Sequence, residues 1–266
     1  DGLVYIVNPE DLCAVETAVR LKESLGGEIT VLTLGPPRAE EALRSCLALG
    51  ADRAVLLQDG AFRGGDPFVT ATALAAVIEK INSELILTGS RTLDGGHAQV
   101  PAAIAELLGL PFVSGVTDLN VVPGQGIALH RKLERGDREV MECSLPALVA
   151  VTEGIGTPRY ASLPDVIASL RQEIEVLRAG DLNLRQGQIG ERGSLKTLVR
   201  LTPPRPRPKK TFIPDSSLSP AERMRQLMTG GITQKKSGEI LEGDPEQIAS
   251  QVVRLLIDEK IVEAVK

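Results

Sequence analysis

A chain of 266 residues, of which 42% are hydrophobic and 24% charged, is long enough for one large α/β domain with an appendage or for two small domains. Its formal net charge of −5, the absence of Trp and the presence of only two Tyr and four Phe argue against a nucleic-acid binder, which needs basic charge and stacking rings. No apolar stretch has membrane-spanning length and the first residues do not form a secretory signal, so we expect no membrane span.

The cysteines and histidines give little sign of redox, metal or acid–base chemistry. Cys13 and Cys46 fall on helical faces and Cys143 stands alone, a pattern typical of reduced thiols in a reducing compartment. His130 lies in an alternating stretch, where we expect a strand surface, and no His/Cys cluster has metal-ligand spacing. We therefore predict no catalytic residue and no metal site, and interpret the chain as a binder or carrier.

The first part of the chain alternates strands with helices. Asp66-Pro67, for example, places a capping residue before a proline at the first helical position. This rhythm predicts an α/β fold with a Rossmann-like parallel sheet and helices on both faces, which binds ligands at the carboxyl ends of its strands. We expect strands at 3–7, 28–34, 53–57 and 85–88 and helices at 12–25, 39–49 and 67–81.

Residues 83–101 form the stretch most informative about function. An apolar strand ends at Thr88-Gly89, a polar turn carries Asp94-Gly95-Gly96, and a helical pattern follows from Ala102 to Leu108. A strand, a glycine-rich turn and a helix together direct backbone N–H groups and a helix N-terminus toward a phosphate. The alternative is that the glycines serve turn geometry alone.

After Pro111 the pattern changes to successive strands, which we expect at 112–119, 127–133, 139–144 and 147–151, followed by a helix at 163–170. We interpret these strands as a meander that extends the sheet antiparallel. Residues 1–171 are thus predicted to form a nucleotide-binding α/β domain.

Residues 172–266 are predicted to form an extended C-terminal arm that ends in a helix and packs on a partner subunit. The stretch 180–194 is polar, and the prolines of 202–210 exclude helix. The basic residues there favour a solvated linker over a nucleic-acid patch. Asp244-Pro245-Glu246-Gln247 then starts a helix whose apolar face comprises Ile248, Val252, Val253, Leu255 and Leu256. A small separate domain is the alternative to the arm.

These residues resemble the beta subunit of electron-transfer flavoproteins over nearly the whole chain. The motifs that carry the resemblance are Val7-Asn8-Pro9 with the helix after it, 30–36, 48–54, Asp66-Pro67, 146–151, 158–164, and Gly238-Glu239-Ile240 with 243–246. The resemblance implies a heterodimer with an alpha subunit that holds the redox FAD. It also implies electron transfer between acyl-CoA or other dehydrogenases and a downstream acceptor, in the cytoplasm or, in a eukaryote, in the mitochondrial matrix.

By the same motif match, the family's pocket for FAD or AMP falls on Asn8, Pro9, Glu10, Asp11, Leu34, Gly89, Arg91, Asp94, Gly95, Gly96, His97, Ala98, Gln99 and Val100. The leucine of the family's docking loop falls on Leu182, in Gly180-Asp181-Leu182. A nucleotide sensor of related α/β fold without a flavin partner is the alternative function.

Two departures from the family pattern bear on the ligand. The family has a further strand before the Asn-Pro segment, so this sequence is either a fragment or lacks that element. Arg91-Thr92 replaces the usual Gln-Ala, and Gly96-His97 replaces more polar pairs. Asp94-Gly95 followed by Ala98-Gln99-Val100 is closer to members that hold a second FAD than to those that hold AMP. His97 is either a charge partner of the phosphates or an exposed turn residue.

Overall fold

The computed structural model describes residues 6–122, 124, 126–197, 199–200, 202, 214–228 and 243–258. The chain divides into two compact units, Asp1–Arg200 and Leu201–Lys266. Within the described residues, no helix is long and apolar enough to cross a membrane.

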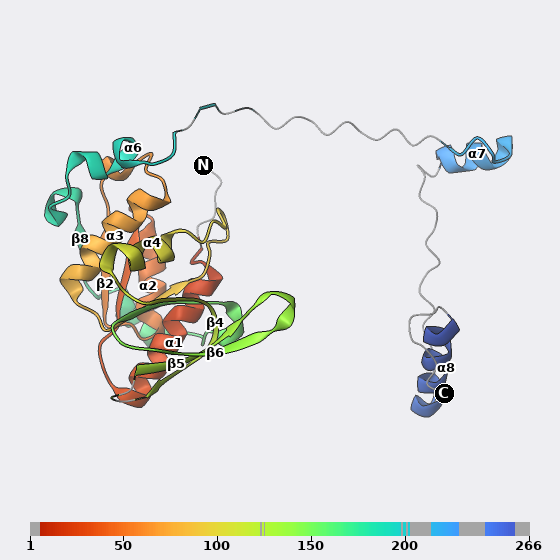
Figure 1. Cartoon of the computed structure of the whole chain (residues 1–266), viewed down its shortest axis with the longest axis horizontal. Helices are drawn as coiled ribbons and strands as arrows, with labels where there is room; N and C mark the ends of the chain where they lie inside the picture. The colour runs from red at the N-terminus through yellow and green to blue at the C-terminus, as the bar shows by residue number, and fades with distance from the viewer. Residues whose placement is uncertain are drawn as a thin grey trace. The chain divides into compact units, whose positions relative to one another are not determined.

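The first unit, in which Figure 1 labels α1 to α4, β2 and β8, contains a three-stranded parallel sheet in the order β1-β2-β8. Its strands are β1 (Thr30–Leu34), β2 (Arg53–Leu57) and β8 (Glu175–Leu177). Alternate residues of β2 face opposite sides, so that Ala54 and Leu56 pack with α2 (Ala39–Leu49) while Val55 and Leu57 pack with α3 (Pro67–Ile81). Helices therefore cover both faces of this sheet.

A second, five-stranded sheet has the order β3-β7-β4-β5-β6. It comprises β3 (Leu85–Gly89), β7 (Ala147–Val151), β4 (Phe112–Val122), β5 (Gly126–Lys132) and β6 (Arg138–Cys143). On one face, Cys13 and Ala14 of α1 (Pro9–Leu25) pack with β7, β4 and β5. On the other face, α3 and α4 (Val100–Leu108) cover Ile86 and Leu148. These two sheets confirm the predicted α/β class.

The predicted meander is wrong in one respect. Only β4, β5 and β6 are antiparallel neighbours, whereas β7 lies between β3 and β4 and runs parallel to both. The reason is that every residue of β7, Ala147–Val151, is buried. A strand that is apolar on both faces is stable in the centre of a sheet, where helices cover it from both sides.

Several predicted boundaries differ from the observed ones at the ends of the first unit. α1 begins at Pro9 rather than at 12, because a proline suits the first helical turn. Of the predicted strand 3–7, residues 3–5 lie outside the described residues. Ile6 and Val7 form no regular element. The unit extends to Arg200, beyond the predicted boundary at 171, because β8 pairs with β2.

The remaining short helices of this unit are α5 (Leu163–Ser169), α6 (Gly190–Gly193) and the 3₁₀ turns η1 (Gly60–Phe62), η2 (Glu134–Gly136), η3 (Glu153–Ile155), η4 (Ala179–Leu182) and η5 (Gln186–Gln188). Most of the stretch 180–194, predicted to be polar, thus lies in short 3₁₀ turns and one helical turn.

The second unit contains α7 (Pro220–Met228) and α8 (Pro245–Asp258). α8 is the predicted terminal helix. α7 was not predicted, although Ser219 and Glu222 form reciprocal hydrogen bonds of the capping-box type at its start. Of the predicted Pro-rich linker, 203–210 lies outside the described residues, as does the motif Gly238-Glu239-Ile240.

Candidate functional site

The loop that follows β3 is hydrogen-bonded to side chains at the start of α1. Asp11 Oδ1 accepts a 2.6 Å hydrogen bond from Gly89 N–H, and Asn8 Oδ1 accepts a 3.0 Å bond from Leu93 N–H. Asn8 Nδ2 also donates to Arg91 O at 3.0 Å and to Asp11 Oδ2 at 3.0 Å. The Asn8 side chain does not cap its own helix, and instead spans the gap to the loop.

Glu10 also contacts the loop, from a buried position. The residue is 8% exposed, and its Oε2 accepts a 2.8 Å hydrogen bond from Arg91 N–H. The Arg91 guanidinium lies beside the same carboxylate, with Nε 3.7 Å from Oε1, but its side chain is 71% exposed. Arg91 therefore presents a positive charge at the surface of the loop.

Gly89 allows the close approach between this loop and α1. A Cβ at this position would lie 2.9 Å from Glu10 Cβ and 3.0 Å from both Asn8 Nδ2 and Asp11 N. Carbon atoms do not approach so closely without displacement, so any larger residue would separate the strand end from the helix.

The next part of the loop is held by its own side chains. Thr92 O accepts a 3.0 Å hydrogen bond from Gly96 N–H, and Asp94 Oδ1 accepts one of 2.5 Å from Gly95 N–H. Hydrogen bonds from the Thr92 hydroxyl and from Gly95 N–H hold the pKa of Asp94 below its usual value. Gly96 has φ +60°, which favours glycine. The N–H groups of Gly95 and Gly96 are thus committed within the loop.

The end of the loop carries backbone N–H groups that have no acceptor among the described residues. Within the described part of the chain, the N–H groups of His97, Ala98, Gln99 and Val100 donate no hydrogen bond. Ala98 has φ +52°, a conformation that costs a non-glycine residue about 1 kcal/mol. Residues 91–99 are exposed, and α4 begins at Val100. Unpaired N–H groups at a helix N-terminus form an electropositive surface.

A distant segment contacts the same helix start. Lys196 Nζ donates a 3.0 Å hydrogen bond to Gln99 Oε1. Asp66, the N-cap of α3, holds this segment with Oδ2, which accepts from Leu195 N–H at 2.9 Å and from Lys196 N–H at 3.2 Å. Sequence reasoning predicted the cap but missed Lys196, because a contact across so many residues leaves no local pattern.

The other predicted site residues lie in different surroundings. Pro9 is the first residue of α1, and His97 is exposed with Nδ1 within hydrogen-bond distance of Gly95 O. Leu34 ends β1 and packs with a cluster under α3. Leu182 belongs to that cluster and is only 5% exposed. The structure thus brings Asn8, Glu10 and Asp11 together with 89–93, but Leu34 packs elsewhere and Leu182 is not presented as a surface anchor.

The cysteines and His130 occupy the predicted environments. Cys13 and Cys46 are buried, all three thiols are free, and His130 is exposed on β5. Burial raises the pKa of Cys46 to about 11, which disfavours the reactive thiolate. Among the residues that the structure describes, no group of three or more His, Cys, Asp or Glu side chains could hold a metal ion.

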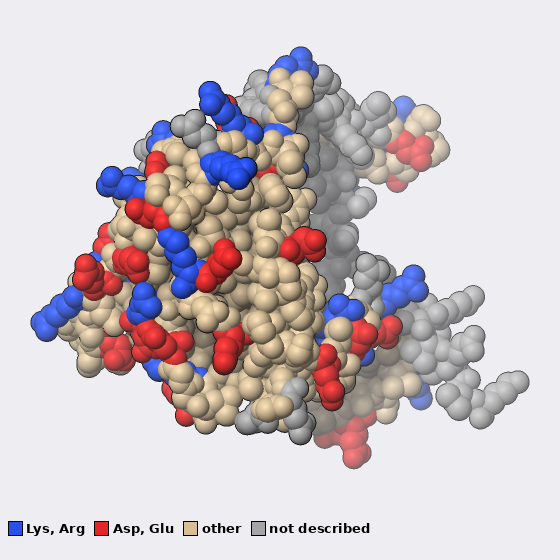
Figure 2. Space-filling view, turned by 60° about the vertical axis from the view of Figure 1, so that its left-hand side comes forward, with Lys and Arg blue, Asp and Glu red and all other residues tan. Residues whose placement is uncertain are grey.

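The charged side chains on one face of the molecule are mixed in sign. On the face that Figure 2 shows, basic and acidic side chains are interspersed around a broad area without charge. Neither sign forms a continuous field there, in keeping with the net charge of −5.

The fold and the loop define an α/β protein with exposed backbone donors at one helix start. Comparison with known proteins identifies its family: residues 1–182 match the model of the electron transfer flavoprotein domain. The chain belongs to the electron transfer flavoprotein family, and the resemblance predicted from the motifs is confirmed.

Similar proteins of known name include beta subunits. The chain is 38% identical to the electron transfer flavoprotein subunit beta of Thermoanaerobacterium thermosaccharolyticum, over 77% of this chain and 78% of the relative. It is 40% identical to protein FixA of Azotobacter vinelandii, over 81% and 79% of the two chains. It is 39% identical to the caffeyl-CoA reductase-Etf complex subunit CarD of Acetobacterium woodii, over 77% and 78%. The first of these relatives is by name a subunit of an electron transfer flavoprotein.

Proposed function

We propose that this chain is the beta subunit of a heterodimeric electron-transfer flavoprotein. It binds an adenine nucleotide, FAD or AMP, and its alpha partner holds the redox FAD. Together they pass electrons from acyl-CoA or other dehydrogenases to a downstream acceptor in a reducing compartment, either the cytoplasm or the mitochondrial matrix. Family membership and the names of the similar subunits support the proposal.

The observation that carries the nucleotide site is the set of unpaired N–H groups from His97 to Val100. These N–H groups belong to the exposed residues 97–99 and to half-buried Val100, lie at the start of α4 and fit a phosphate, which accepts several hydrogen bonds at once. Exposed Arg91 and Lys196 supply positive charge nearby. The N–H groups of Gly95 and Gly96 already donate hydrogen bonds within the loop. We therefore propose that only the N–H groups of 97–100 donate to the phosphate.

A flavin, when bound, supplies the capacity to accept and release electrons. The proposed work of this chain is to bind and orient the nucleotide, and we assign no residue a catalytic role. We favour FAD over AMP because Gly95 and Gly96 leave room at the turn, and because a pyrophosphate offers more oxygens to the N–H groups than one phosphate does. A second FAD would make electron bifurcation the natural activity.

The proposal includes docking of partner dehydrogenases through Leu182, which requires that this side chain first become exposed. An anchor must enter a partner's pocket, whereas Leu182 packs with Val55, Leu57 and Phe62. The turn η4 would therefore have to open before Leu182 could dock.

The test is to co-express the full chain with the neighbouring gene product, record the visible spectrum, and quantify FAD and AMP after acid extraction. We expect a yellow heterodimer with two FAD. One FAD and one AMP would support the electron carrier but exclude bifurcation. A colourless monomer would contradict the proposal and favour the nucleotide sensor.

The placement of the nucleotide is tested by two variants of the loop. Asp94→Ala removes an acceptor for Gly95 N–H, and Gly95→Val adds a side chain whose Cβ alone would lie 3.4 Å from the Thr92 hydroxyl oxygen. Both should lower nucleotide occupancy by about tenfold, the effect of losing roughly 1.4 kcal/mol of binding. Gly187→Val is the matched control, because a Cβ there meets nothing within 4 Å. Unchanged occupancy in both loop variants would place the site elsewhere.

A further inference from the structure

We infer that Asn8, Glu10 and Asp11 are positioning residues that fix the backbone of 89–93 and do not bind the phosphates of the nucleotide. This inference rests on the proposed function, and it revises the role that the family resemblance implies for these residues. We call the three side chains the loop clamp.

In the loop clamp, three N–H groups of the segment 89–93 point to one helix. The N–H groups of Gly89, Arg91 and Leu93 point to α1 and meet Asp11, Glu10 and Asn8 in turn. Ser90, between the first two, donates its N–H in the other direction, to Val151 O of β7 at 2.9 Å. The first turn of α1 thus binds every second N–H group from Gly89 to Leu93.

The chemistry of the clamp residues favours positioning of the loop over contact with a phosphate. Glu10 is 8% exposed, and the carboxylates of Glu10 and Asp11 already accept backbone N–H bonds. A carboxylate repels a phosphate, whereas it is favoured in the first turn of a helix, where the dipole is positive. The negative charges are therefore stabilised by α1 and by the loop, and they leave the positive donors at 97–100 free for an anion.

Gly89 is a structural requirement of the same arrangement. A Cβ there would lie 2.9 Å from Glu10 Cβ, so the clamp and the loop meet only with glycine at this position. The side chains of the loop clamp, together with the absence of a side chain at Gly89, thus determine a single path for the loop between β3 and Asp94.

The experiment uses the full chain in complex with its partner and measures two quantities. The first is the nucleotide occupancy of the complex. The second is the rate of amide hydrogen exchange at 89–93, measured with nucleotide bound and again after its removal. The variants are Glu10→Ala and Asp11→Ala, each paired with Glu10→Gln or Asp11→Asn, which keep an acceptor oxygen without the charge. Glu41→Ala is the matched control, an exposed acid in the first turn of α2.

We expect the alanine variants to accelerate exchange of 89–93 about tenfold and to lower occupancy, because each releases an N–H group of the loop. The glutamine and asparagine variants should restore both quantities to within about twofold of the parent, since a carbonyl oxygen still accepts the bond. Glu41→Ala should change neither.

Two results would overturn the inference. One is unchanged exchange in both alanine variants. The other is loss of nucleotide in Glu10→Gln and Asp11→Asn with normal exchange, which would mean that the charges contact the ligand. If an alanine variant at Glu10 or Asp11 does not fold, Asn8→Ala, at the more exposed end of the clamp, should still accelerate exchange of Leu93. A parent complex without nucleotide would refute the proposed function alone, because the exchange of 89–93 tests the clamp without it.

Discussion

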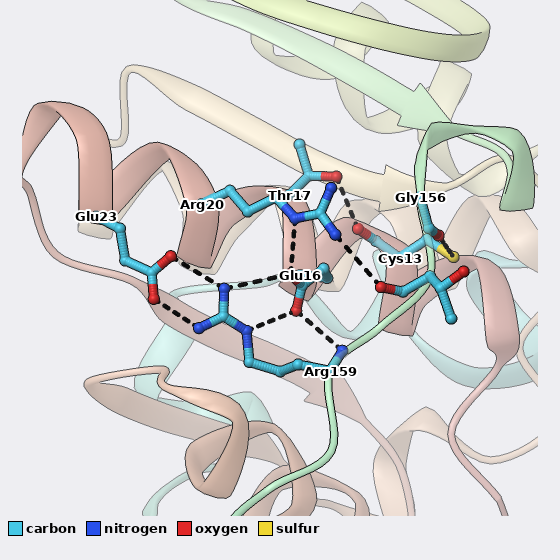
Figure 3. A network of polar contacts seen from close by, with 8 residues as sticks. Cys13, Glu16, Thr17, Arg20, Glu23, Gly156 and Arg159 are labelled. Carbon is cyan, nitrogen blue, oxygen red and sulfur yellow. Dashed lines mark hydrogen bonds and ion pairs between the residues drawn. The ribbon is translucent and has the colours of Figure 1, made fainter.

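Glu16 is the most deeply buried acidic residue in the described part of the chain, at 3% exposure. Its carboxylate accepts hydrogen bonds from Arg159 Nε at 2.8 Å, from Arg159 N–H at 3.1 Å and from Arg20 Nε at 2.7 Å (Figure 3). Arg159 also reaches Glu23, with its Nη1 2.5 Å from Oε1. The network fastens the segment after η3 to α1, and thereby fixes the helix whose first turn holds the site loop.

The hydrogen bonds to Glu16 make stability depend on pH. Burial alone would raise the pKa of Glu16, but the bonds from Arg159 and Arg20 outweigh it, and the pKa lies below its usual value. A group with a lowered folded pKa contributes its full stability above the unfolded pKa of about 4.3, and this contribution is lost as the pH falls through the folded pKa.

We therefore predict that Glu16→Gln lowers the free energy of unfolding by about 1–3 kcal/mol at pH 7, because a neutral amide accepts weaker bonds than a carboxylate. The difference from the parent should shrink as the pH falls toward 3, where the parent's own Glu16 becomes protonated. Urea unfolding curves across this range would measure it, with exposed Glu41→Gln as the control. A difference that stays constant with pH would contradict the prediction.

At the scale of elements, Asp66 joins two parts of the chain that are distant in sequence. Its Oδ1 caps α3 by accepting from Phe68 N–H at 3.0 Å and Val69 N–H at 3.1 Å, while Oδ2 holds the backbone of Leu195 and Lys196. One carboxylate thus starts a helix and places the segment that carries Lys196.

We predict that Asp66→Ala lowers the free energy of unfolding by about 1–3 kcal/mol, through loss of the cap and of the second pair of bonds. Asp66→Asn should keep the cap, because the amide retains one carbonyl oxygen, but it should release Leu195 and Lys196. Thermal unfolding and hydrogen exchange of 194–197 would separate the two effects. The exposed Asp137→Ala serves as a control. Slow exchange of 194–197 in both Asp66 variants would refute this role.

The elements best predicted from sequence are those whose ends have a local chemical cause. α3 starts at Asp66-Pro67 and α2 ends before Gly50, as expected. The place of β7 between β3 and β4 was missed because strand order depends on packing partners that lie far along the chain. β8 was missed because Glu175–Leu177 is too short to show a period, and only its pairing with β2 makes it a strand.

At the scale of the whole molecule, the loop that we propose as the site was predictable in its position between a strand and a helix, but its hydrogen bonds were not. The strand, turn and helix around Gly89 and Val100 indicated a loop at the carboxyl end of a strand. Which N–H groups remain unpaired there depends on Asn8, Glu10 and Asp11, whose contacts cross from another helix. Sequence patterns give the type of residue near a site, whereas the division into clamped and unpaired donors follows from tertiary contacts.

The second unit leaves an apolar surface that its own helices do not cover. In α8, Val252, Val253 and Leu255 are 40%, 55% and 52% exposed. Apolar side chains at this spacing on one helix are stable when buried against another surface, since removing them from water is favourable. We infer that this face packs on the partner subunit, as the arm that the sequence predicts.

Charging this face should therefore prevent assembly without unfolding the first unit. We predict that Val253→Asp and Leu255→Asp each weaken copurification of the partner subunit about tenfold or more, because burying an unpaired carboxylate in an apolar contact costs well above 1.4 kcal/mol. Gln251→Asp introduces the same charge at an exposed polar position of the same helix and should retain the partner. Far-ultraviolet circular dichroism melts should show the same main transition in all variants, because the first unit, Asp1–Arg200, has its own core. If the partner is retained by both apolar-face variants, or lost equally in Gln251→Asp, the apolar face of α8 is not the contact that holds the two subunits together.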